Sequence, residues 1–182
     1  DLEWEWSAFS TVIVGSARWD PEFNRVRFNH FRDMQKLVKH IQARGFHRIG
    51  LVTSRDLEER SQHGIDAGFW SALSPGLRKE TSIFDRDIRT KVQFEKWMRE
   101  YQPDCLILGP KKLLKPLQDH SNPPAIYFRN LSDSTSPHSY PGLSQSYAQL
   151  GQVAADQLMA QLQLNQFGIP SSPTQTLISG TI

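Results

Sequence analysis

Few side chains in this sequence have the types and spacing that catalysis requires. The 182 residues contain no G-x-S-x-G nucleophile motif, no Walker-type phosphate-binding loop and no glycine-rich dinucleotide fingerprint. Three histidines, His30, His40 and His47, have no second ligand at metal-binding spacing within one predicted element. The single cysteine, Cys105, lies in the apolar run DCLILG, which is typical of an inert buried thiol. We therefore predict no enzyme activity, no catalytic residue, no metal site and no cofactor.

The polar segment around residue 60 contains two candidates for ligand binding. His63 and Arg60 lie in a predicted helix that follows a strand, so both could contact a ligand at the end of that strand. A solvated helix face is the simpler explanation for the same two residues. The neighbouring run RDLEER is explained as the charged first turn of that helix, with Glu58 and Glu59 near the helix N-terminus.

The elements that would position these side chains alternate between strand and helix. Apolar residues at i, i+3, i+4 and i+7 predict an amphipathic helix that ends at Gly45. The predicted strands span residues 9–15, 48–54, 81–85, 104–109, 124–128 and 174–179. The predicted helices span residues 31–45, 57–73, 90–101, 111–119 and 146–168, and residues 130–141 are a predicted loop.

Most of the predicted strands are short apolar runs without polar alternation. This pattern is typical of a parallel sheet that is buried on both faces. We therefore predict an α/β fold in which helices cover both faces of a parallel sheet. Sites in such sheets lie beyond the carboxyl ends of the strands. Ligand contacts are expected in segments 16–20, 53–60, 86–89, 109–112 and 129–133.

The composition excludes several classes of protein. Hydrophobic residues make up 38% of the chain and charged residues 22%, which is polar for a globular protein but not typical of disorder. The formal net charge of +2 is too small and too dispersed to predict nucleic-acid binding by these residues. No apolar run reaches the roughly 18 residues of a membrane span, and one cysteine allows no internal disulfide. A reducing cytoplasm is the simplest compartment for such a chain.

Five segments follow one another in a specific order: VRFNHFRDMQKLVKHIQARGFHRIGLV from residue 26, DAGFWSAL from 66, QPDCLILG from 102, QSYAQLGQVAADQL from 145 and NQFGIPSSPTQTLISG from 165. No single segment is diagnostic, but the ordered set is. From about residue 9 to its end, the chain resembles the effector-binding core of the lactose-repressor (LacI/GalR) family of transcription regulators. The resemblance implies a type I periplasmic-binding-protein-like fold.

The resemblance also implies two subdomains, of which the first is incomplete. Members of the family carry a helix-turn-helix DNA-binding domain, a hinge and the first part of that subdomain before the point where this chain begins. We expect residues 1–28 and 142–165 to be the remnant of the N-terminal subdomain. Residues 29–141 and 166–182 are expected to form the C-terminal subdomain of a longer regulator.

The implied function is the sensing of a small-molecule effector, a sugar or a sugar acid, by a cytoplasmic regulator of transcription. Operator DNA would be bound only through the domain that is missing here, and no membrane is involved. Family members pair side by side, which implies a homodimer. An incomplete subdomain would also expose apolar side chains such as Phe9, Val14, Leu150 and Leu158. We therefore expect this chain to self-associate through residues 9–15 or 146–162.

The ligand contacts of the family, carried over residue by residue, give an atypical pocket. Gln145 keeps the residue of the family, and Ser16 falls where an Asp is common after the first strand. Lys111 stands where the family often has an Asn-Asp pair after a strand. Arg129 and Asn130 replace an Asp-Asp pair after the next strand.

Two cations at neighbouring strand ends distinguish this pocket from that of the family. Lys111 and Arg129 would favour an anionic effector, although both could instead be solvated. The ligand-contacting Arg of the family is replaced by Ile65. We expect both cations to face the cleft between the subdomains together with Gln145 and Ser16. The candidate ligand-binding residues are Gln145, Arg129, Lys111, Asn130, Ser16, His63 and Arg60.

Two other classes of function stay open at the level of sequence. The first is a periplasmic-type solute-binding protein of a sugar uptake system, which has the same fold. The second is an enzyme on a flavodoxin-like sheet, for which no nucleophile-base pair is visible. The residues that precede Asp1 in the gene would discriminate, since a regulator carries a helix-turn-helix and an uptake protein a signal peptide.

Overall fold

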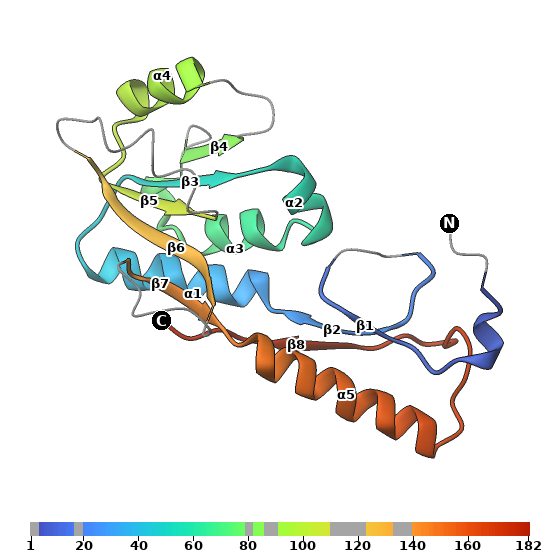
Figure 1. Cartoon of the computed structure of the whole chain (residues 1–182). Coiled ribbons are helices and arrows are strands. Elements are labelled where there is room, and N and C mark those ends of the chain that lie inside the picture. Colours follow the sequence, from blue (N-terminus) through green and yellow to red (C-terminus); the bar gives the residue numbers. More distant parts are fainter. Residues whose placement is uncertain (1–3, 17–19, 79–81, 86–90, 110–122, 133–139) are drawn as a thin grey trace. The chain divides into compact units, whose positions relative to one another are not determined.

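The computed structural model describes residues 4–16, 20–78, 82–85, 91–109, 123–132 and 140–182 (Figure 1). The chain divides into two compact units: unit 1 contains residues 1–29 and 146–179, and unit 2 contains residues 30–145 and 180–182. These boundaries differ from the expected ones by one residue at Asn29 and by longer segments in two other places. Residues 142–145 belong to unit 2 because they pair with a strand there, and residues 166–179 belong to unit 1 because their strand pairs with residues 25–28.

Unit 2 is built on a five-stranded sheet with the order β4-β3-β5-β6-β7. Every neighbouring pair of strands is parallel, so the predicted parallel sheet is confirmed. β7 is an additional strand beyond the prediction. The strands are β3 (Ile49–Thr53), β4 (Ile83–Asp85), β5 (Cys105–Leu108), β6 (Ala125–Ser132) and β7 (Gly142–Gln145).

Helices cover both faces of this sheet, as the alternation of elements predicts (Figure 1). On one face, Ile107 of β5 packs in a core with Phe69 of α3 and Leu37 of α1. On the other face, Leu106 packs in a second core with Trp97 of α4. Successive strand residues thus enter different cores, which is why the strands are apolar throughout. The helices are α1 (His30–Ala43), α2 (Arg55–Arg60), α3 (Gly64–Ala72) and α4 (Lys91–Tyr101).

Two glycines allow elements of unit 2 to approach closely. A Cβ at Gly68 of α3 would lie 2.5 Å from the carbonyl oxygen of Phe31 in α1. A Cβ at Gly50 of β3 would lie 2.8 Å from the ring of Trp97 in α4. Both distances are shorter than a real Cβ contact, so the packing of both helix layers depends on these glycines.

The predicted helix over residues 57–73 is wrong in one respect, because two helices replace it. The helical path ends after α2, where Gln62 and His63 both take left-handed backbone angles with φ 56°. α3 then begins at Gly64 in a new direction. The buried carboxylate of Glu58 holds this junction, since it accepts the backbone N–H of Asp66 at the start of α3 (3.1 Å).

Unit 1 has a smaller sheet of three parallel strands in the order β1-β2-β8, with α5 packed against it. Val26 and Phe28 of β2 form its core with Leu150 of α5. The Ser146 side chain caps α5 by accepting the backbone N–H of Gln149 (3.3 Å). The elements are β1 (Val12–Val14), β2 (Asn24–Phe28), α5 (Tyr147–Gln163) and β8 (Gln175–Ile178).

Some predictions fall on residues outside those that the structure describes. The predicted helix over residues 111–119 lies there, and so does most of the predicted loop over residues 130–141. The start of that loop is instead the end of β6, and its last residues lead into β7. Among the described residues, no helix has the length and apolar character needed to cross a membrane.

Candidate functional site

Two of the predicted ligand-binding residues line one small cavity in unit 2. Gln145 is the last residue of β7, and Arg129 belongs to β6. The cavity has a volume of about 10 Å³, which is room for one water molecule. Its other lining residues are His30, Asp33, Met34, Leu37, Ile65 and Leu143.

Arg129 and Asn130 lie inside a strand rather than after it. β6 continues to Ser132, and its pairing with β7 shifts register between Phe128 and Leu131. Such irregularities re-aim side chains and are common next to functional sites. The guanidinium of Arg129 lies against the end of β5, because a Cβ on Gly109 would come within 2.6 Å of its Nη2 atom. The glycine at position 109 therefore makes room for the Arg129 side chain.

Asp33 is a member of this site that the sequence analysis does not identify. Its side chain is 2% exposed, and its Oδ1 accepts the backbone N–H of Gly180 (2.9 Å). Lys36 donates to the Gly180 carbonyl oxygen (3.1 Å), which ties the same segment to α1. Burial raises the pKa of Asp33, whereas the Gly180 N–H, the Lys36 charge and the Gln145 side chain each lower it.

A signal for Asp33 does exist in the sequence. Asp33 precedes Leu37 by four residues and Ile41 by eight, so it lies on the buried stripe of α1. An acidic residue on an apolar stripe is expensive to bury without partners and is therefore a candidate for a polar site. The cavity thus combines a carboxylate, an amide and a guanidinium within a mainly apolar wall.

The other predicted contacts are not in this cavity. Arg60 is exposed and forms an ion pair with Asp56 one turn earlier (2.6 Å). It therefore lies on a solvated helix face, which is the simpler of the two explanations for this residue. Ser16 belongs to unit 1, and Lys111 lies outside the described residues. The expectation that Lys111, Arg129, Gln145 and Ser16 share a cleft therefore stays a prediction.

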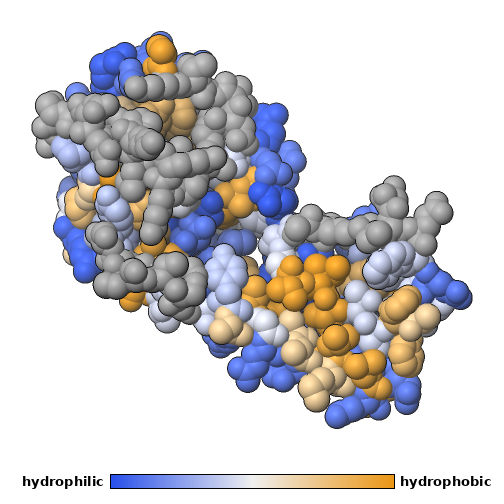
Figure 2. Space-filling model, in the orientation of Figure 1, coloured by the Kyte–Doolittle hydropathy of each residue, from blue (hydrophilic) through white to orange (hydrophobic). Residues whose placement is uncertain are grey.

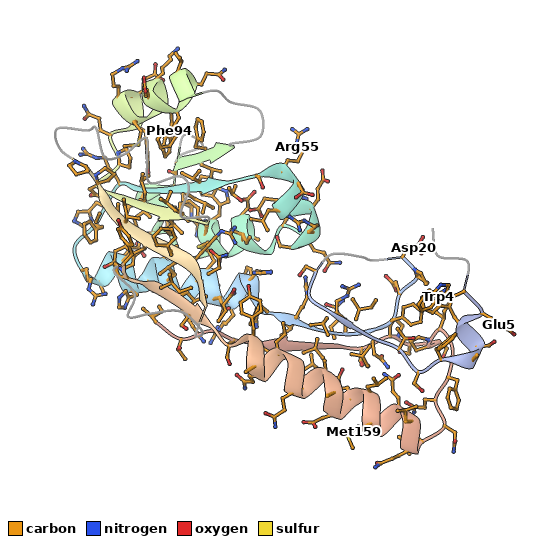
Figure 3. All side chains as sticks on the ribbon, viewed as in Figure 1. Trp4, Glu5, Asp20, Arg55, Phe94 and Met159 are labelled. Carbon is orange, nitrogen blue, oxygen red and sulfur yellow. The ribbon has the colours of Figure 1, made fainter. Side chains whose placement is uncertain are left out.

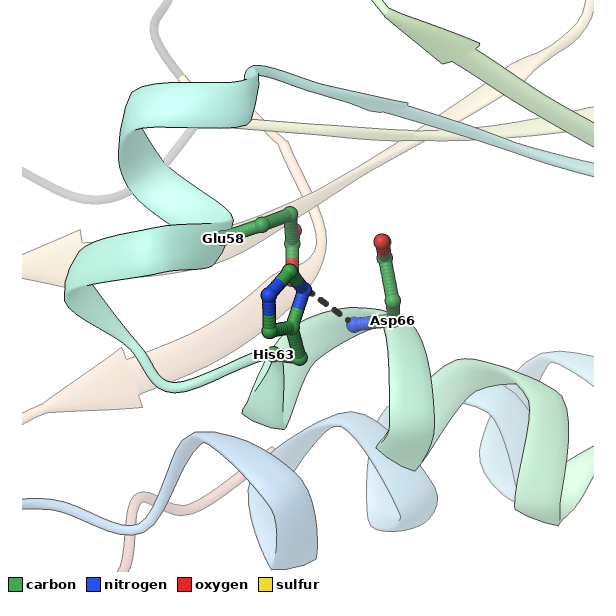
Figure 4. A group of neighbouring side chains, drawn as sticks. All are labelled: Glu58, His63 and Asp66. Carbon is green, nitrogen blue, oxygen red and sulfur yellow. Dashed lines mark hydrogen bonds between the residues drawn. The ribbon is translucent and has the colours of Figure 1, made fainter.

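A second group of polar residues lies at the end of β3 and after it, and only Thr53 and Glu58 of this group fall within the predicted contact segment 53–60. Glu58 is 4% exposed, in contrast to the solvated first turn that the run RDLEER suggests. Its Oε1 accepts the hydroxyl of Thr53 (2.5 Å), the last residue of β3, and its Oε2 accepts the N–H of Asp66. His63 lies next to both carboxylates (Figure 4).

Comparison with known proteins rests on structure alone, since no family model and no curated protein matches the sequence. A LacI family transcriptional regulator from Enterococcus faecium with bound ribose superposes with a TM-score of 0.65 at 15% identity, over 93% of this chain and 67% of that one. The transcription regulator CcpA of Lactococcus lactis gives 0.68 at 17% identity, over 94% and 67%. The chain has the fold of the LacI-family regulators. The dual regulator Cra from Pseudomonas putida, in complex with fructose 1-phosphate, gives 0.67 at 16% identity, over 94% and 67%.

The LacI-type fold confirms the resemblance that the ordered segments indicate. The chain spans about two thirds of the length of these regulators, and 56% of the regulator CelR in its cellobiose complex. In the LacI-type fold of this chain, the backbone passes between the two units after Asn29, Gln145 and Ser179. Gln145 therefore stands directly at one of these passages.

Proposed function

We propose that this chain is the effector-sensing part of a LacI-family transcription regulator that acts in the cytoplasm. The fold likeness carries the proposal, because eight structures of transcription regulators, three of them described as LacI-type, match 93–94% of the chain with TM-scores from 0.63 to 0.68. In this role the chain binds a small molecule without changing it chemically. The effector acts by favouring one arrangement of the regulator over another. DNA binding belongs to a part of the regulator outside these residues.

The polar groups around Arg129 suit an effector that carries hydroxyl groups and one anionic group, and the cavity, which has room for one water molecule, would have to open to admit it. A guanidinium offers paired N–H donors that match a carboxylate or a phosphate. Gln145 offers both a donor and an acceptor for hydroxyl groups, and the carboxyl group of Asp33 offers acceptors. Three of the similar regulators were solved with ribose, cellobiose and fructose 1-phosphate. We therefore propose a sugar acid or another anionic sugar derivative as the effector class.

A thermal-shift screen of neutral sugars, sugar acids and sugar phosphates, followed by calorimetry, tests the proposal. An effector at 100 times its Kd stabilises the folded chain by about 2.7 kcal/mol. Arg129→Ala removes charge-assisted hydrogen bonds and should weaken an anionic hit by roughly 10- to 100-fold. Gly109→Ala should weaken the same hit less, because it displaces the guanidinium without deleting it.

The matched control is Arg44→Ala, which removes an exposed arginine just after α1. This variant should bind the hit as the parent chain does. A screen without any sugar-like hit would contradict the effector class. Equal weakening by Arg129→Ala and Arg44→Ala would contradict the role of Arg129.

We also propose that the chain self-associates through unit 1. Most of the large hydrophobic side chains that are exposed among the described residues belong to this unit, and Figure 2 shows hydrophobic residues gathered on its surface. Met159 projects from the outer side of α5 and is 57% exposed (Figure 3). Leu150 does not contribute, because it is buried in the core of unit 1. The exposed side chains are Trp4, Phe9, Val14, Tyr147, Met159, Leu162, Leu164, Phe167, Ile169 and Leu177.

Light scattering of the chain at micromolar concentration measures this association. Covering each such side chain contributes about 1.5–3 kcal/mol, so a dimer or larger species is expected. Met159→Glu combined with Leu162→Glu should shift the mass toward the monomer, because both residues are exposed on the same helix. The control is Val92→Glu on α4 of unit 2, where an exposed side chain is changed in the same way. A clean monomer mass near 20.9 kDa for the parent chain would refute the proposal.

A further inference from the structure

Three side chains with metal-binding atoms converge where α2 gives way to α3 (Figure 4). Glu58 belongs to α2, His63 directly precedes α3, and Asp66 lies in the first turn of α3. One ligand atom from each side chain lies within 4.8 Å of the other two. None of the three lines the cavity around Gln145, so their chemistry is additional to that of the proposed effector site.

Glu58 is held in a defined orientation by hydrogen bonds to both of its oxygens. The Thr53 hydroxyl donates to Oε1 (2.5 Å) and the Asp66 backbone N–H donates to Oε2 (3.1 Å). A carboxylate has about four lone-pair sites, so each oxygen keeps one for a further partner. In metal centres, ligating carboxylates are oriented by hydrogen bonds of this kind. The buried Glu58 therefore offers a ligand that is already in place.

The backbone brings His63 back beside Glu58 instead of extending the helix. Gln62 and His63 both have left-handed φ angles of 56°, and the His63 N–H donates to the Glu58 carbonyl oxygen (2.7 Å). The His63 side chain is exposed, so its imidazole is accessible to an ion from solvent. Asp66 follows three residues later, one turn further along the chain.

Two carboxylates and one imidazole form a donor set for a divalent transition-metal ion. Mg²⁺ and Ca²⁺ prefer oxygen ligands alone, whereas imidazole suits zinc and its neighbours in the first transition row. Zinc bonds to nitrogen and oxygen are about 2.0–2.2 Å long, so the ligand atoms around zinc lie about 3–3.5 Å apart. Binding of one zinc ion therefore requires the three ligand atoms, which lie within 4.8 Å of one another, to draw together to this spacing.

We propose that Glu58, His63 and Asp66 bind one divalent transition-metal ion beyond the carboxyl end of β3. The ion would bind between two neighbouring carboxylates, one of them buried, and neutralise their charge. The competing explanation is that Glu58 only holds the start of α3 through the Asp66 N–H. The two explanations differ in the role of His63, because only the metal site needs its imidazole.

Calorimetric titration of the untagged, chelator-treated chain with ZnCl2 tests the proposal, with MgCl2 as the comparison ion. We expect one Zn²⁺ per chain with a micromolar or tighter dissociation constant, and no comparable binding of Mg²⁺. His63→Gly should weaken Zn²⁺ binding by at least ~10-fold. Glycine adopts a left-handed backbone without strain, so this variant keeps the turn and the fold. Asp66→Asn keeps the backbone N–H on Glu58 and should also weaken Zn²⁺ binding.

The matched control is His47→Ala, which removes another exposed histidine of unit 2. Its Zn²⁺ affinity should equal that of the parent chain. Cys105 does not compete for zinc, since it is buried and burial raises the pKa of its thiol. Equal weakening by His63→Gly and His47→Ala, or no saturable Zn²⁺ binding in the micromolar range, would overturn the proposal. Failure here leaves the effector screen unaffected, because that screen is read without metal.

Discussion

The two sheets of this chain are covered to different extents. β3 and β5 of unit 2 consist only of buried residues, and cores lie on both of their faces. β2 of unit 1 alternates, because Val26 packs against α5 while Arg25 and Arg27 point to the opposite face. A sheet between two helix layers needs apolar residues at every position, whereas one with a single layer needs them at every second position. The difference shows how the pattern of a strand reports the layers around it.

The charged face of β2 is stabilised by polar contacts rather than by a helix. Arg25 is only 2% exposed, and its Nη1 donates to the Gly15 carbonyl oxygen (2.7 Å). Burial, reinforced by the nearby charge of Arg27, lowers the pKa of Arg25. Unit 1 therefore relies on fewer apolar contacts than unit 2. Three substitution pairs, each with one member in each unit, test this contrast.

The largest effect is expected from removing a phenylalanine ring from each unit. Phe69 of unit 2 is 0% exposed, whereas Phe167 of unit 1 is 49% exposed. Phe69→Ala leaves a cavity between α1, α3 and the sheet and should lower the free energy of unfolding by about 3–5 kcal/mol. Phe167→Ala should change it by about 0.5 kcal/mol or less. Urea unfolding followed by circular dichroism measures both, and similar losses would break the contrast.

A helical glycine in each unit should respond to alanine in opposite directions. At Gly68 a Cβ would collide with the Phe31 carbonyl oxygen, so Gly68→Ala should destabilise unit 2 by about 1–3 kcal/mol. At Gly151 of α5 a Cβ meets nothing within 4 Å. Gly151→Ala should therefore stabilise α5 by about 0.5–1 kcal/mol through helix propensity. Thermal unfolding of the two variants decides the sign, and stabilisation by Gly68→Ala would show that α1 and α3 are less tightly packed.

The smallest effect is a pH dependence that belongs to unit 2. Burial raises the pKa of Asp33 above its ordinary value of 3.8, so the folded chain holds this proton more tightly than the unfolded chain. The resulting stabilisation is present below that value and is lost as the pH rises through the raised pKa. Asp33→Asn should therefore gain stability relative to the parent chain as the pH rises above 3.8.

Asp156→Asn, which changes an exposed aspartate of α5, is the control in unit 1. Urea unfolding at several pH values should show a larger gain for Asp33→Asn than for this variant. Equal pH dependence of the two variants would mean that burial does not raise the pKa of Asp33.

Prediction from sequence was most accurate for strands that are buried on both faces, because their residues do not alternate between apolar and polar. The apolar strands of unit 2 and the amphipathic α1 were identified because their patterns follow directly from layer packing. β2 escaped prediction because its alternating arginines do not resemble a buried strand. β7 escaped because Gly142 and Ser144 give a short strand little apolar signal, and Gly142 meets the backbone of Phe128 too closely for any side chain.

The candidate site was predictable only in part. Gln145 and Arg129 were found through the family resemblance, and the structure brings them to one cavity. Asp33 was not found, because Arg129 and Gln145, which share that cavity with it, come from β6 and β7 and its hydrogen-bond partner is Gly180. The burial of Glu58 was also not found, since a charged run beside a helix start looks solvated until the turn at Gln62 and His63 folds it inward.

The sequence by itself determined the α/β class, the alternation of helices and strands that makes the sheet parallel, and the likeness to LacI-type regulators. It could do so because hydrophobic periodicity and motif order are local properties of the chain. The tertiary structure alone decided which strand joins which unit: β8 follows α5 in the chain but pairs with β2, some 150 residues earlier. It also decided which charges are buried, placing Asp33 against Gly180 and Glu58 against Thr53 and Asp66. The apolar stripe of α1 indicates that Asp33 is buried, but the partners of both carboxylates come from segments outside their own helices, and no local pattern of residues records those contacts.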